Sequence, residues 1–96
     1  MRMLLKFSMD TEAGNAAVRN GTAGPLLERV LGDLKPEAAY FVADGGRRTG
    51  YVFFDLAEVS DIPRSCEPLF MELGAEITLT PAMSPADVAA GLGKVG

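Results

Sequence analysis

The side chains best suited to chemistry in this sequence lie near its two ends, in "MLLKFSM" and "AEITLTP". Each stretch alternates apolar and polar residues, so the polar side chains of each share one face: Lys6, Ser8, Glu76, Thr78 and Thr80. If the two stretches are neighbouring strands, these side chains can lie together. They would form either a polar pocket with Glu76 as a general base, or a satisfied network in which Lys6 pairs with Glu76.

The two tyrosines of the chain, Tyr40 and Tyr51, stand on either side of "GGRRTG". In a pocket, a phenol can hydrogen-bond a substrate oxygen and present an aromatic wall, so both are candidates for catalysis and for ligand binding. In the alternative interpretation each ring fills a core and keeps its hydroxyl at the rim. "GGRRTG" itself is predicted to be a hairpin loop, because phosphate-binding loops precede a helix and here a strand-like run follows.

Asn15 and Arg19 are further candidates for ligand binding, one turn apart on a predicted helix. They can share a surface beside "NGTAGP", residues 20–25, which interrupts the helical pattern with two glycines and a proline. If a cleft lies between the helices and the sheet, this break is its expected portal. The alternative is that both side chains belong to a solvated helix face.

The absence of histidine narrows the chemistry further. Histidine is the commonest metal ligand and the only side chain whose ordinary pKa lies near neutrality, so histidine-dependent catalytic triads are excluded. No metal and no other cofactor is expected. The single cysteine, Cys66, rules out an internal disulfide and falls on an apolar helical stripe, which predicts a core position.

Composition indicates one folded domain over residues 1–96, with 48% hydrophobic and 23% charged residues. The net charge of −4 and the single basic doublet, Arg47-Arg48, exclude a nucleic-acid partner of the usual basic kind. The opening "MRMLLKF" is too short for a signal-peptide core, and nothing approaches a membrane span. A cytoplasmic location is therefore expected, with no membrane partner.

The positioning elements follow from periodicity. Strands are predicted over 3–9, 38–44, 50–56 and 75–81, with helices after the N-cap Asp10, over 62–73 and over 84–92. The first helix is either kinked or split near residues 21–25, and its apolar stripe runs from Leu26 to Leu34. The order β-α-β-β-α-β plus a tail helix predicts an α+β, ferredoxin-like domain with an antiparallel sheet.

Strands 38–44 and 50–56 are apolar on both faces, although this topology supplies helices for one face only. A monomer rarely leaves so large an apolar area exposed, so the sequence predicts a homodimer joined sheet to sheet. Phe41 and Phe54 are the expected interface residues, and an aspartate at either should break the dimer.

Three segments, "MDTEAGN", "KPEAAYF" and "EPLFMELGAEITLTPAM", resemble a group of small bacterial proteins in the dimeric α/β-barrel superfamily. The resemblance implies two ferredoxin-like protomers that close a barrel with the helices outside. Its members include cofactor-free oxygenases, isomerases and effector-binding modules, so the fold alone assigns no chemistry. Two functions are therefore expected: a small-molecule-binding dimer, either a carrier or a metal-free isomerase or oxygenase, or a non-catalytic module that mainly self-associates.

Overall fold

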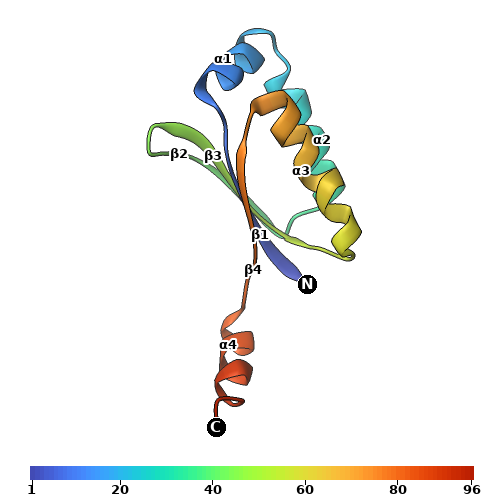
Figure 1. The fold of residues 1–96 in the computed structure, drawn as a ribbon, viewed down its shortest axis with the longest axis vertical. Helices are drawn as coiled ribbons and strands as arrows, with labels where there is room; N and C mark the ends of the chain where they lie inside the picture. Colours follow the sequence, from blue (N-terminus) through green and yellow to red (C-terminus); the bar gives the residue numbers. More distant parts are fainter.

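The computed structural model describes residues 1–96 and places nearly every predicted element where the sequence indicates (Figure 1). In chain order the elements are β1 (Arg2–Ser8), α1 (Thr11–Arg19), α2 (Ala23–Leu34), β2 (Ala38–Asp44), β3 (Arg47–Asp55), the short 3₁₀ helix η1 (Val59–Asp61), α3 (Ile62–Leu73), β4 (Glu76–Pro81) and α4 (Pro85–Leu92). The first predicted helix is thus split in two.

The strands form one antiparallel sheet in the order β2-β3-β1-β4. β1 and β3 are central, and β2 and β4 are the edges. The predicted α+β class and the antiparallel pairing are therefore confirmed. The expectation that the strands of "MLLKFSM" and "AEITLTP" are neighbours is confirmed as well, since β1 pairs with β4 over Met3–Ser8.

The hydrophobic core lies between the sheet and α1, α2 and α3, which all cover the same face (Figure 1). Alternation along β1 points Met3, Leu5 and Phe7 into this core, where each is buried. Leu69 and Leu73, one turn apart on α3, pack from the opposite side with no exposed area. The apolar side chains of the helices and the inward-facing side chains of the strands therefore form one core layer.

The break between α1 and α2 has a local cause. Asp10 caps α1 by accepting a hydrogen bond from the Ala13 amide at 2.9 Å, as the sequence predicts. The helix ends at Asn20, and Gly21 then takes a φ of +78°, which few other residues adopt. The Asn20 side chain accepts a hydrogen bond from the Thr22 amide and turns the chain into α2.

The hairpin between β2 and β3 is tighter than predicted. Its loop is only Gly45-Gly46, whose φ angles of +60° and +79° suit a two-residue turn with both residues left-handed. The prediction that all of "GGRRTG" is loop is therefore wrong, since Arg47 to Gly50 pair within β3. The two glycines alone form the turn, so both arginines belong to β3.

The ends of two other helices also have local causes. Gly74 ends α3 with a φ of +54°, and Ser84 and Asp87 form a reciprocal capping box at the start of α4. No helix combines the length and the apolar character needed to span a membrane.

The C-terminal helix α4 extends from the end of β4 away from the rest of the domain (Figure 1). It accounts for much of the 54 Å length of the molecule, which measures only 28 × 18 Å in the other two directions. None of its side chains is buried, and Leu92 is 67% exposed. An eight-residue helix is marginal in water without a packing surface, so α4 is an apolar segment without a cover in its own chain.

The interface residues expected from the sequence lie on the wrong face. Phe54 is buried beneath the helices at 2% exposure, and Phe41 lies on the same side, opposite Gly50 and next to Phe7. The period of two in a strand explains the error, because which of two apolar sets faces the helices depends on tertiary packing. The helix-free face instead carries half-buried Leu4 and Phe53, which are cross-strand partners, and the two tyrosines.

Candidate functional site

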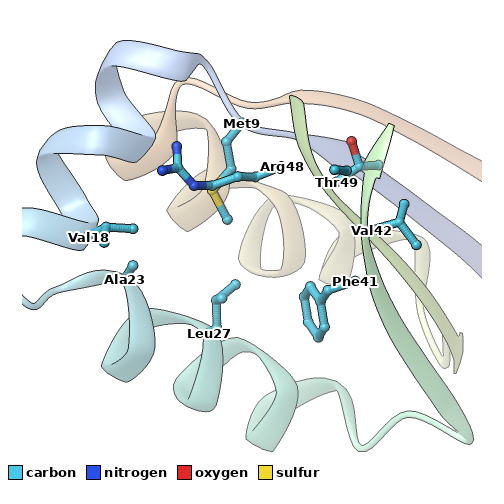
Figure 2. Close-up of a pocket in the computed structure, with 9 residues that line it drawn as sticks. Met9, Val18, Ala23, Leu27, Phe41, Val42, Arg48 and Thr49 are labelled. Atoms are coloured by element: carbon cyan, nitrogen blue, oxygen red, sulfur yellow. The ribbon is translucent and has the colours of Figure 1, made fainter. Parts of the chain in front are cut away.

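An apolar groove opens between the α1–α2 pair and the β2–β3 hairpin (Figure 2). Its cavity volume is about 420 Å³, within the range of roughly 300 to 1,000 Å³ typical of small-molecule sites. The lining residues come from both layers: Met9, Val18, Ala23, Leu27, Phe41, Val42, Ala43, Arg48 and Thr49. The groove is therefore a cleft between the sheet and the helices, one of the positions that the sequence left open for a pocket.

The groove exists because the helix layer does not reach the edge strand. β2 is exposed along most of its length, whereas most residues of its neighbour β3 are buried or half-buried. Phe41 packs its ring edgewise on buried Phe7, with centroids 6.2 Å apart, but keeps 48% of its area exposed. One side of that ring belongs to the core and the other side forms the groove wall.

The predicted portal at residues 20–25 lies at the groove. Val18 and Ala23, on either side of the helix break, are both lining residues (Figure 2). Asn15 and Arg19, the candidates on α1, do not line it. Val18 lies between them in the sequence and is the α1 side chain that reaches the groove.

Two polar residues, Arg48 and Thr49, contribute to the groove. The Thr49 hydroxyl is already engaged, since it donates to the Arg47 carbonyl at 3.1 Å and lies 3.2 Å from the Ser8 hydroxyl. The Arg48 side chain makes no hydrogen bond and no ion pair within the chain. Arg48 is therefore the one polar lining residue free to bind a ligand.

A second cluster, on the helix-free face, gathers the other candidates. The register aligns Tyr40, Tyr51, Lys6 and Thr78 in one row across all four strands. Glu76 lies in the adjacent row, opposite Ser8. The predicted common face is thus present, but this cluster is open to solvent, with Tyr40 66% exposed.

The contacts within this cluster differ from the predicted pairing. Lys6 Nζ lies 3.4 Å from Asp44 Oδ2 and 5.6 Å from the centre of the Tyr51 ring. Tyr51 donates its hydroxyl hydrogen bond to the same Asp44 oxygen at 2.8 Å. The predicted Lys6–Glu76 pair is wrong, because Glu76 instead pairs with Arg47 at 3.3 Å. Extension of β3 through the expected loop is what brings Arg47 within reach of Glu76.

The electrostatics of this cluster argue against a role for it in proton transfer near neutral pH. The Tyr51 hydrogen bond, followed by that of Lys6 and its charge, lowers the pKa of Asp44 below its ordinary value. The electrostatic attraction of the Tyr51 side chain, and then the hydrogen bond to Asp44, raise the pKa of Lys6. Lys6 therefore stays a cation and Asp44 a weakly basic anion, and an effective general base needs a pKa nearer the working pH.

Replacing Tyr51 with phenylalanine should raise the pKa of Asp44 toward its ordinary value, because the largest stabiliser of the carboxylate is removed. A depressed folded pKa contributes stability above the unfolded value of about 4, and this stability is lost as pH falls through the folded pKa. Carboxyl-carbon NMR titration of both proteins measures the shift, with Asp33 as an internal control. An unchanged Asp44 titration in the variant would contradict the hydrogen-bond assignment.

Cys66 lies in the core, as predicted. Burial, and then the charge of Glu67, raise the pKa of its thiol, so the sulfur stays protonated and unreactive. The structure brings together no group of three or more histidine, cysteine, aspartate or glutamate side chains that could hold a metal ion.

Comparisons of the chain with protein-family models, curated proteins and solved structures gave no match. The resemblance to dimeric α/β-barrel proteins therefore stays a prediction, and the site is interpreted from its own geometry.

The residues that line the groove, above all Arg48 and Phe41, were not among the predicted site residues. One signal was present: in a strand, consecutive residues point to opposite faces, so the Arg47-Arg48 doublet must place one arginine on each side of the sheet. Because the doublet was predicted to lie in a hairpin loop, the strand alternation was not applied to it.

Proposed function

We propose that this protein binds a small, largely apolar organic molecule in the groove between α1–α2 and the β2–β3 hairpin. The observation that carries the proposal is the open apolar cavity of about 420 Å³ in a chain of 96 residues. Exposed apolar concavities of this kind are unfavourable in water unless something occupies them.

Binding is favoured over catalysis by the chemistry of the lining. An isomerase, or an oxygenase that uses no cofactor, needs a group that accepts a proton from its substrate. The lining holds no carboxylate, tyrosine or lysine, and the candidates Lys6, Tyr40, Tyr51 and Glu76 lie on the helix-free face, outside the groove. The proposed role is therefore that of a carrier or a ligand-sensing module.

We further propose that the domain is ferredoxin-like and functions as a sheet-to-sheet homodimer. The central position of β1 and β3, and helices on a single face, support the fold assignment. The helix-free face supports the dimer, because Leu4, Phe53 and Tyr51 are only half-buried there and no helix covers them. A second copy of the chain would cover these side chains.

A second candidate function is a non-catalytic module whose main property is self-association. The exposed apolar side chains of the C-terminal segment favour it: Met83, Val88, Leu92 and Val95. These residues have no packing surface in their own chain, and another protein surface is the usual cover for such a segment.

N-phenyl-1-naphthylamine, a neutral apolar fluorophore, tests the binding function. We expect it to bind the wild-type protein with one site per chain and increased fluorescence. Ala43→Phe on β2 should raise its Kd tenfold or more, because the added ring occupies the groove.

Ala89→Phe is the matched control, since it adds the same ring to the exposed surface of α4, outside the groove. Its Kd should equal that of the wild type. Equal loss of binding in both variants, or saturable binding that Ala43→Phe leaves unchanged, would contradict the groove as the binding site. Absence of probe binding would favour the self-association module.

A further inference from the structure

We propose that the ligand of the groove is an organic acid, with an apolar body between the two layers and a carboxylate bound by the guanidinium of Arg48. This inference rests on the proposed binding function and specifies the chemistry of the ligand.

The two arginines of the doublet have different roles. Arg47 points to the helix-free face and pairs with Glu76 at 3.3 Å. Arg48 points to the opposite side, where it lines the groove and has no acidic partner. Arg48 has no acidic partner even though acidic residues outnumber basic ones in this chain, 13 to 9. The guanidinium keeps all five of its N–H donors free for an oxyanion.

The position of the guanidinium is set by a glycine on α1. Figure 2 shows the Arg48 side chain crossing from the sheet toward α1. A Cβ at Gly14 would lie 2.9 Å from Arg48 Nη1, so the missing side chain leaves the space that the guanidinium fills. Gly14 is buried in α1, so the guanidinium lies against α1 at the groove wall, while the Arg48 residue as a whole stays exposed to solvent and to a ligand.

The surroundings of Arg48 favour a negative charge. No acidic residue lines the groove. The N-terminus of α2 begins at Ala23 in the lining, has no acidic residue in its first turn, and has no side-chain cap on its Thr22 N-cap. The dipole of α2 adds a partial positive charge at this end of the helix.

A carboxylate fits this arrangement better than a phosphate. The groove supplies one full positive charge, and a guanidinium fork matches the two oxygens of a single carboxylate. The remaining lining is apolar and includes the Phe41 ring, Leu27 and Met9, which suit an alkyl or aromatic body. The ligand class is thus an apolar monocarboxylic acid.

Decanoate and 1-decanol, which share a chain length and differ in charge, provide the test by displacing N-phenyl-1-naphthylamine. Arg48→Gln should raise the decanoate concentration needed for half displacement tenfold or more, and change the values for 1-decanol and the probe far less, because neither carries a charge for the guanidinium to bind. Arg48→Lys should give an intermediate loss for decanoate, because it keeps the charge without the fork.

Arg19→Gln is the matched control, an arginine of α1 outside the groove that should leave both displacements unchanged. A decanoate value that Arg48→Gln does not change would overturn the inference, as would an equal loss for decanoate and decanol. In both cases the probe still binds, so the groove function stands. If the probe does not bind the wild type, the proposed function fails and this inference fails with it.

Discussion

Replacing Gly50 with alanine should destabilise the domain by roughly 3 kcal/mol, the upper part of the range for overpacking a core. Gly50 pairs with Phe7 on one side and Phe41 on the other, and is buried. A Cβ at this position would fall 2.5 Å from Phe7 Cζ and 3.1 Å from Phe41 Cε1. Phe7 is only 1% exposed, so its ring has no free space to move into.

The Phe7 ring therefore packs directly over Gly50. Replacing that ring with the smaller leucine side chain should relieve the clash with an alanine at position 50. Urea unfolding of Gly50→Ala, Phe7→Leu and the double variant measures the coupling. We expect the double variant to be more stable than the sum of the single effects by at least about 1 kcal/mol.

Gly32→Ala on α2 is the matched control for Gly50→Ala. A Cβ there meets no atom within 4 Å, and alanine should stabilise the helix by about 0.5 to 1 kcal/mol. Equal stability of Gly50→Ala and the wild type would show that the ring does not pack across Gly50. The same result would also count against the position of the Phe7 ring on which Phe41, a wall of the groove, packs.

The second large effect concerns the helix-free face. Phe53→Asp should raise the dissociation constant of the proposed homodimer by roughly a hundredfold or more, since a carboxylate would be buried without a partner in the interface. Phe53 is half-buried beside Leu4 and Ala38 and lies away from the core beneath the helices. The folded protomer should therefore tolerate the change better than it would tolerate an aspartate at Phe54.

Met71→Asp, at a 74% exposed position on the outside of α3, introduces the same charge without touching the sheet. Sedimentation equilibrium of both variants and the wild type, with far-UV circular dichroism to verify folding, measures the mass of each. We expect a dimer for the wild type and Met71→Asp, and a folded monomer for Phe53→Asp. A monomeric wild type, or an unchanged dimer in Phe53→Asp, would contradict the sheet-to-sheet assembly.

The aspartate variants suggested by the sequence alone, at Phe41 and Phe54, would not test this interface. An aspartate at Phe54 would unfold the protomer, because that side chain is buried beneath the helices. An aspartate at Phe41 would alter the groove wall. Both faces of β3 look alike in the sequence, so alternation identifies two sets of residues without saying which set the helices cover.

The sequence predicts which polar side chains gather on the helix-free face, but not how they pair. The common face of Lys6, Glu76 and the threonines follows from strand alternation and is present in the sheet. The partners of the charged groups could not be predicted, because Asp44 and Arg47 enter the cluster only through the tight Gly45-Gly46 turn. A difference of three residues in where β3 begins, at 47 instead of the predicted 50, changed the ion pairs of the cluster.

The amino-acid sequence by itself determined the elements of this protein. Its strands follow from alternation or from short apolar runs, its helices from apolar stripes, and helix ends from Asp10, Ser84 and Gly74. These signals are local, because a cap or a period acts within one or two turns. Only the tertiary structure decided that the helix layer stops short of β2, and that Arg48 meets Gly14 across the resulting groove. Such features depend on how far two packed layers overlap, a property of many side chains together that no local pattern encodes.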